Sequence, residues 1–375
     1  MSRRFLNMIM DKYVCDRLAF SLHRINPWRC FYPTTAQALE AASAASNKAA
    51  MEDARLSRAV ISFYNPCPPV GVGEMEFMSL GCSSNDIISM DQDGNTLLYD
   101  PATRAIRVMP APHAPKEAPV SLAMGDTLYL LDRNPGPQEA HPFEALVYSR
   151  PRPNMGCYNE KWYWRSLPPP PFANEYPCGR EVEEEEEDSS HCHQNGDPYV
   201  IRAYTVVGES QIWISTVGGG TFSFNTMTGV WSKAGDWALP FYGRVEYAPE
   251  HGLWFGFSSE GWQFAASDLG VASAARPPVL QKVWNDLVPP LPKCWVPFEP
   301  YLLPLGSGKF CIARIFNRAE EGWSQEKHGK LYNNLETFAV LTGVEVESGS
   351  RGALRMIKHK SRRYSFGDVT MVQPL

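Results

Sequence analysis

The sequence predicts an all-β fold, a single six-bladed β-propeller with two long insertions. A pattern of short apolar strands and tight turns recurs five times, and two of the intervals between equivalent strands are 41 residues, which is the length of one four-stranded blade. β-Branched and aromatic residues are enriched in these segments, as they are in strands generally. Both ends of the chain contain further segments of this kind, and together these can form a sixth unit.

Each of the five repeated units contains four expected strands. The first strands, four of which end in glycine as tight hairpin turns prefer, are 77–81, 120–125, 204–208, 245–249 and 302–306. The second strands are 87–91, 128–132, 212–216, 253–257 and 310–314. The third strands are 96–100, 143–148, 221–225, 262–266 and 338–342. The fourth strands are 106–109, 162–165, 230–233, 279–284 and 354–357.

The two ends of the chain supply the sixth unit. Residues 5–10, 18–23 and 60–63 are expected to be its second, third and fourth strands, and its first strand is expected at 369–372. A ring closed in this way leaves no exposed sheet edge, and exposed edges invite aggregation. Because the repeats leave no independent domain boundary, we expect residues 1–375 to form one domain.

Two segments do not fit the strand pattern. The first, 28–56, is an alanine-rich insertion, and its part 36–54 is expected to be a short helix or a mobile excursion. The second, 168–199, begins with four consecutive prolines and contains an acidic run. Such a composition predicts a disordered surface loop, because it cannot bury enough apolar surface to order itself.

The formal net charge of −6 comes from 41 acidic and 35 basic residues, and one segment carries it. Seven acids with no base among them lie between 181 and 188, so the rest of the chain is nearly neutral. A neutral fold argues against a nucleic-acid partner, because nucleic-acid binders are usually strongly basic. No run approaches the roughly 18 apolar residues that span a bilayer, so we expect no membrane partner. We also expect the protein to be a monomer.

The cysteines favour an intracellular protein. Nine of them are scattered along the chain, and no two have Cys-x-x-Cys spacing. Disulfide frameworks belong mostly to small secreted domains, and the first residues lack the apolar core of a signal peptide. We therefore expect the protein in the cytoplasm, the nucleus or both.

The candidate metal ligands are His191, Cys192 and His193, with Cys178 nearby. Zinc needs about four nitrogen or sulfur ligands in a tetrahedron, and adjacent ligands in a disordered loop supply no such geometry. The residues are interpreted as part of a solvated loop, and no metal or other cofactor is expected.

Two charged clusters are candidate interaction sites, although solvated loops and strand edges often carry such charges. The acidic cluster could bind a basic protein or a cation, and comprises Glu183, Glu184, Glu185, Glu186, Glu187 and Asp188. The basic cluster could be a nuclear localisation signal or a phosphate-binding patch, and comprises Lys358, Lys360, Arg362 and Arg363.

Other residues have a functional and a structural interpretation. Asp91 and Asp132 end equivalent strands, so they could face a central channel or belong to hairpin turns. Four tryptophans fall at strand positions, where packing between blades explains them without a ligand; they are Trp213, Trp231, Trp254 and Trp284.

Seven strings of residues resemble one known family. They lie at 98–100, 162–171, 219–224, 231–237, 305–311, 338–346 and 358–361. The chain resembles, from about Arg4 to its end, a grass-plant family named domain of unknown function 1668 and described as kelch-like or F-box-associated-like. The resemblance implies a β-propeller and no catalytic residues, since the family has no established ones. The chain lacks the paired glycines of kelch repeats proper, so "kelch-like" is an analogy of architecture.

The expected architecture limits the functions to consider. A propeller presents loops at two faces, and the fold alone does not specify what they bind. The leading hypothesis is a non-enzymatic protein-interaction scaffold with an unknown protein partner, comparable to the recognition module of an adaptor. Residues 1–60 contain no F-box, so any ligase-binding part is expected on another chain. The alternatives are an enzyme with its site at the central channel and a nuclear factor that uses the basic cluster.

Overall fold

The computed structural model shows an all-β protein with one α-helix. Within the part of the chain that it describes, no sheet closes on itself and no helix is long and apolar enough to cross a bilayer. The described residues are 5–14, 17–44, 51–64, 75–81, 86–116, 118–137, 139–149, 161–174, 198–285, 295–318, 336–349, 353–367, 369 and 372–375.

The strands form antiparallel groups that follow one another along the chain. One four-stranded sheet contains β5 (Met75–Leu80), β6 (Asp86–Asp91), β7 (Thr96–Asp100) and β8 (Ala105–Met109). The next contains β9 (Val120–Met124), β10 (Thr127–Leu131), β11 (Phe143–Ser149) and β12 (Lys161–Ser166). An eight-stranded sheet follows, with β13 (Ile201–Val207), β14 (Gln211–Thr216), β15 (Gly220–Asn225), β16 (Val230–Gly235), β17 (Phe241–Ala248), β18 (Leu253–Ser258), β19 (Phe264–Ser267) and β20 (Leu280–Trp284).

The last two sheets contain strands from distant parts of the sequence. One is built from β22 (Tyr301–Gly306), β23 (Lys309–Arg318), β24 (Glu336–Ser348) and β25 (Leu354–Gly367), with β21 (Trp295–Pro297) and β3 (Glu52–Ala54) added. The other has the order β26 (Val372–Pro374), β1 (Leu6–Val14), β2 (Arg17–Ile25) and β4 (Ile61–Tyr64).

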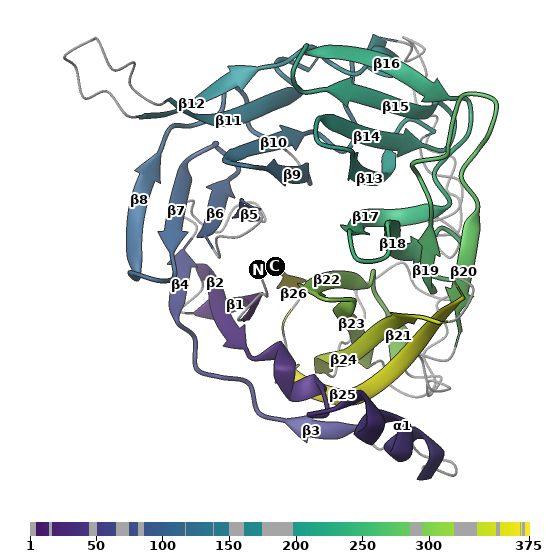
Figure 1. Ribbon diagram of the computed structural model, residues 1–375. Helices are drawn as coiled ribbons and strands as arrows, with labels where there is room; N and C mark the ends of the chain where they lie inside the picture. Colours follow the sequence, from purple (N-terminus) through teal and green to yellow (C-terminus); the bar gives the residue numbers. More distant parts are fainter. Residues whose placement is uncertain are drawn as a thin grey trace, which may run out of the picture.

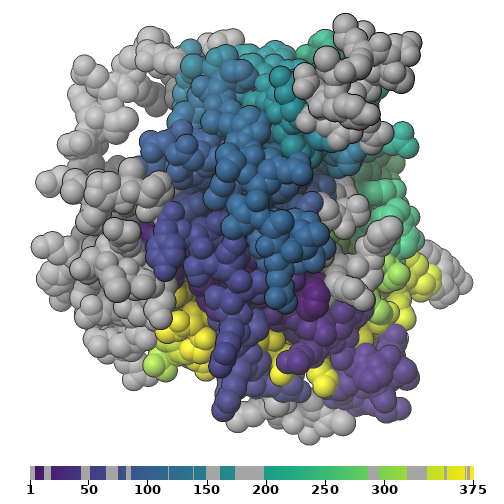
Figure 2. Space-filling view, turned by 90° about the vertical axis from the view of Figure 1, so that its left-hand side faces the viewer, coloured from purple at the N-terminus to yellow at the C-terminus, as the bar shows by residue number. Residues whose placement is uncertain are grey.

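The sheets stand around a common centre, with their strands running from an inner to an outer position (Figure 1). The innermost strands are β26, β5, β9, β13, β17 and β22. Outer strands such as β8 form the surface: Val108 on β8 is 81% exposed, and Figure 2 views the molecule from this side. The C-terminal residue Leu375 lies near the centre, where it pairs with Asn7 of β1 (Figure 1).

The strands predicted for the five repeated units are confirmed. Each expected segment overlaps an observed strand in the predicted order. One difference concerns β19, which begins at Phe264 instead of the predicted Trp262. Trp262 has a φ of 49° in the left-handed region, so it belongs to the turn that precedes the strand.

The pairing of the two chain ends is also confirmed. β26 pairs antiparallel with β1, and the amide of Asn7 donates to the carbonyl of Leu375 at 3.1 Å while the Leu375 amide donates back at 2.8 Å. The strand lies at Val372–Pro374, whereas 369–372 was expected. Val369 instead accepts a hydrogen bond from the Thr337 hydroxyl through its carbonyl oxygen, so its backbone is held by β24.

The alanine-rich insertion packs against the last repeated unit. It contains the 3-10 helix η1 (Pro27–Cys30) and the helix α1 (Thr35–Ala44). The expectation that 36–54 holds no strand is wrong at its end, because β3 pairs parallel with β25. This pairing joins residues more than 300 positions apart, so no local pattern indicates it.

The start of the proline-rich segment is ordered, in contrast to the disorder predicted for 168–199. Residues 168–174 include the 3-10 helix η2 (Pro171–Asn174), and Phe172 is completely buried. The indole of Trp231 donates to the carbonyl of Pro168 at 2.8 Å. Burial of one aromatic ring therefore fixes this part of the segment, while residues 175–197 lie outside the described residues.

Aromatic residues fill the space between neighbouring sheets. In one cluster Phe255, Phe264 and Trp284 pack against Phe310 of the next unit, with ring centroids of Phe255 and Phe310 5.0 Å apart. Trp254 is also buried and donates to the carbonyl of Val206. The prediction that strand tryptophans pack between units is thus confirmed for Trp254 and Trp284, while Trp213 and Trp231 are partly buried against neighbouring aromatic rings.

Candidate functional site

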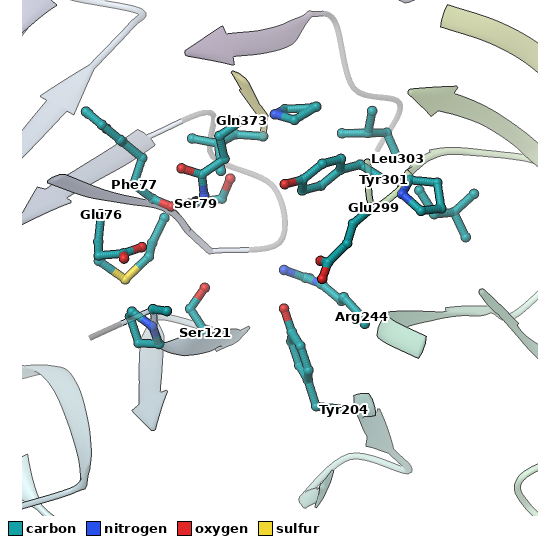
Figure 3. Close-up of a pocket in the computed structure, with 18 of the residues that line it drawn as sticks. Glu76, Phe77, Ser79, Ser121, Tyr204, Arg244, Glu299, Tyr301, Leu303 and Gln373 are labelled. Carbon is teal, nitrogen blue, oxygen red and sulfur yellow. Dashed lines mark hydrogen bonds between the residues drawn. The ribbon is translucent and has the colours of Figure 1, made fainter. Parts of the chain in front are cut away.

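A cavity of about 290 Å³ lies at the centre of the ring (Figure 3). Its wall contains residues from all six innermost strands or from the turns beside them. Because each of these strands contributes only one to four residues, the site exists only when all six groups of strands have assembled. Its volume is at the lower end of the range of small-molecule pockets.

Strand alternation directs polar side chains of β13 into this cavity. Ile201, Ala203 and Thr205 are buried on one face of the strand, and the residues between them point to the other face. Tyr204 on that second face reaches into the cavity with its hydroxyl group (Figure 3). Arg202 lies at an irregularity of the strand between Ile201 and Ala203, and its buried Nε has no hydrogen-bond partner among the described residues.

Three tyrosines with perturbed acidity line the cavity. Burial raises the pKa of Tyr204 and Tyr301, and it raises the pKa of Tyr242 to about 12 with the help of the nearby Glu299 carboxylate. The Tyr242 hydroxyl donates a hydrogen bond to Glu299. All three hydroxyls therefore stay protonated at neutral pH and act as hydrogen-bond donors.

Arginines and glutamates stand around the tyrosines. Arg244 and Glu246 on β17 form an ion pair with 2.7 Å between Nε and Oε1. Arg133 follows β10 and donates from Nε to the carbonyl of Ala118 at 3.2 Å. Positive charge on Arg133 lowers the pKa of each of the three tyrosines, against the dominant effect of burial, so this guanidinium lies near all of them.

The C-terminal strand forms another part of the wall. Gln373 donates from Nε2 to the carbonyl of Phe77 on β5 at 2.9 Å, which ties the terminal strand to the adjacent sheet. Its Oε1 is buried and has no hydrogen-bond partner among the described residues. The cavity wall therefore contains Gln373 together with hydroxyl and guanidinium donors and three carboxylates (Figure 3).

Two of the predicted sites lie outside the described residues. These are the candidate metal ligands His191, Cys192 and His193, and the acidic cluster Glu183, Glu184, Glu185, Glu186, Glu187 and Asp188. Within the described ranges, no group of three or more histidine, cysteine or acidic residues is arranged to hold a metal ion.

The basic cluster lies on β25, where acids and aromatic rings surround it. Lys360 and Arg362 lie 3.8 and 3.6 Å from carboxylate oxygens of Glu52 on β3. Arg363 pairs with Glu336 at 2.9 Å and stacks over the Phe338 ring, while Lys358 also lies on the strand with contacts of its own. These charges hold the alanine-rich insertion and β24 against β25.

Asp91 and Asp132 do not line the central cavity. The Asp91 carboxylate accepts hydrogen bonds from the amides of Asp93 and Asn95, at 3.0 and 2.8 Å, so it stabilises the turn between β6 and β7. This is the hairpin-turn role that the sequence left open. Asp132 is buried beside Arg133, the residue that does reach the cavity.

The cavity residues were not predicted from the sequence. A signal exists, because Tyr242 and Arg244 lie in the first half of β17 and Tyr301 begins β22, where an apolar residue would serve the core equally well. Such a position indicates a residue near the centre only after the order of the strands in space is known.

Comparison with known proteins identifies the family. The sequence model described as "Protein of unknown function (DUF1668)" matches residues 3–364. The chain belongs to this family. Its description contains no kelch or F-box term, so the match supports the family and not those finer names.

Two other comparisons add little. A search of curated proteins found no match. Among solved structures, the chain is similar to the extracellular domain of the putative hybrid two component system BT3049 from B. thetaiotaomicron, with 11% identity and a TM-score of 0.34. That match covers 97% of this DUF1668 chain and 40% of the other chain.

Proposed function

We propose that this DUF1668 protein is a non-enzymatic binding module, a six-bladed kelch-like β-propeller that recognises a partner protein at its central cavity. The observation that carries the proposal is the cavity itself, in which hydroxyl and guanidinium donors from several sheets converge on one space. Donors without protein acceptors are costly to bury, and a bound partner that supplies acceptors removes this cost.

The strand order supports the propeller architecture. Six groups of four strands follow one another, and the innermost strand of each contributes to the same cavity. The eight-stranded sheet divides into two such groups, because β13 and β17 pair only through Ala203 with Gly243 and Tyr204 with Arg244. A parallel pairing this short is a contact between the inner edges of neighbouring blades.

The acidities favour binding over catalysis at the cavity. A general acid or base works best with a pKa near the working pH. Burial moves the pKa of Tyr204 and Tyr301 upward, and that of Tyr242 to about 12, which is away from neutrality. The tyrosines therefore serve as permanent donors, which suits recognition of a partner's acceptor groups.

Affinity purification from the source tissue tests this proposal. The wild-type protein is compared with Tyr204→Phe, which removes one cavity hydroxyl, and with Tyr163→Phe, whose hydroxyl is exposed on β12. A partner-bound hydroxyl contributes about 1–1.5 kcal/mol, so Tyr204→Phe should weaken partner binding about tenfold while Tyr163→Phe does not. Recovery of no specific protein, or equal recovery by the wild type and Tyr204→Phe, would contradict the proposal.

We further propose that the protein acts as a monomer in the cytoplasm or nucleus. Light scattering of the purified chain and imaging of a fluorescent fusion in its own cells test the two parts separately. A stable dimer at micromolar concentration, or a signal confined to the secretory pathway, would contradict them.

A further inference from the structure

The central cavity contains an arginine and a glutamate that form no ion pair. Arg133 makes one hydrogen bond, from Nε to the Ala118 carbonyl, and Glu299 accepts one, from the Tyr242 hydroxyl. Neither side chain lies within 4.0 Å of an oppositely charged group in the described part of the chain. Both side chains are only partly buried, so their charges stay accessible from the cavity that they line.

Both charges act on the same three hydroxyls. For Tyr204, Tyr242 and Tyr301, the positive charge of Arg133 lowers the pKa and the negative charge of Glu299 raises it, while burial is the largest effect on each. Both residues line the same cavity as the three tyrosines, and they form no ion pair with each other.

Hydrogen-bonding groups in the cavity are also without partners. The hydroxyls of Tyr204 and Tyr301 line the cavity and form no hydrogen bond with the described residues. Figure 3 shows these side chains and Glu299 around one space. The wall thus offers donors and acceptors as well as opposite charges.

We propose that the central cavity binds a small zwitterionic group, with its carboxylate at Arg133 and its cationic end at Glu299. A guanidinium holds a carboxylate through paired, charge-assisted hydrogen bonds, and the tyrosine hydroxyls add donors to the same anion. A phosphate dianion fits less well, because Glu76, Glu246 and Glu299 all line the cavity.

This inference rests on the proposed function, since it names the chemistry that the binding module recognises. Two sources carry such a pair of charges: a free amino acid, and the C-terminal lysine or arginine of a protein chain. A cavity of about 290 Å³ accommodates either.

Calorimetric titration of the intact protein tests the inference without any variant. The zwitterions are glycine, 4-aminobutyrate and 6-aminohexanoate, which differ in the distance between charges, and the analogues with one charge are hexanoate and hexylamine. At least one zwitterion should bind tenfold or more tightly than both analogues. The peptide acetyl-Gly-Gly-Lys, with a free or an amidated C-terminus, then distinguishes a protein terminus from a free molecule as the source.

Conservative variants locate the two charges. Arg133→Gln and Glu299→Gln should each weaken binding of the best zwitterion at least tenfold, whereas Arg165→Gln, exposed on β12, should not change it. Thermal unfolding shows whether each variant is folded.

Three results would overturn the inference: zwitterions that bind no better than hexanoate or hexylamine, no binding by any probe, or glutamine variants that bind like the wild type. The co-purification with Tyr204→Phe would still decide the proposed function separately, because a partner recovered through the cavity can present another group.

Discussion

The terminal strand β26 should be essential to the stability of the whole ring. Deletion of residues 372–375 removes the inner strand of one sheet and leaves the edge of β1 unpaired. It also removes the side chain of Gln373, which bonds to β5. The deletion therefore removes contacts from two sheets and part of the wall of the central cavity.

The size of the effect follows from the contacts that are lost. The deletion removes two backbone hydrogen bonds with Asn7 and one from Gln373 to the Phe77 carbonyl, which together stabilise by about 3 kcal/mol at about 1 kcal/mol each. It also exposes the site of Val372, which is 7% exposed, and burial of a valine contributes about 1.5–3 kcal/mol. We expect a loss of about 5 kcal/mol, a large part of the stability of a typical protein.

Urea unfolding followed by tryptophan fluorescence measures this loss. The matched control is Gln373→Ala, which keeps the backbone of β26 and should cost only about 1 kcal/mol. The truncated protein should unfold at a much lower urea concentration and should associate more readily, since an unpaired edge strand invites pairing with another chain. If it unfolds at the same midpoint as the intact protein, the proposed closure through the chain ends does not contribute to stability.

Two further predictions concern buried contacts. Glu144→Gln should destabilise by about 3 kcal/mol at pH 7 in urea unfolding, because Lys116, 2.9 Å away and fully buried, loses its counter-charge. Burial alone would raise the pKa of Glu144, but its hydrogen bonds hold the pKa below 4.5. The stability that the ionised Glu144 contributes should therefore be lost as the pH falls below about 4.5. If the wild type and Glu144→Gln lose the same unfolding free energy at acid pH, this reasoning is refuted. Gly343→Ala should lower the free energy of unfolding by about 2 kcal/mol, because the added Cβ would lie 2.4 Å from the Cys30 carbonyl oxygen. The control is Gly136→Ala, whose added Cβ would lie 3.8 Å from its nearest neighbour, and which should unfold like the wild type in a thermal scan.

The strands could be predicted from the sequence because their signal is local. The segment Gln211–Ile214 alternates in burial, and Gly208 before it adopts the positive φ that its turn requires. Each repeated unit shows such signals, so a weak signal in one unit is supported by its neighbours. The pairing of β26 with β1 was predictable for a related reason, since an incomplete unit at one end needed a strand from the other.

The insertions were predicted less well because their order depends on tertiary contacts. Phe172 is one aromatic residue in a run of prolines, yet its complete burial fixes the start of that segment. Glu52 begins a strand only because Arg362 lies opposite on β25. Composition describes what such a segment does alone, and both of these segments act against a surface made elsewhere in the chain.

The cavity was beyond sequence reasoning for a geometric reason that also bears on its role. Arg133, Tyr204 and Glu299 lie on or beside strands from separate parts of the chain, and they meet only at the central cavity. Core packing does not require charge at this position, since apolar residues could line the same space. A protein that keeps an arginine and a glutamate in this wall, without an ion pair between them, therefore keeps a polar, preorganised space. Substituting both charges by leucine should abolish binding of the zwitterion while the protein stays folded in a thermal scan. A much lower unfolding temperature than that of the wild type would show that the two charges stabilise the fold instead.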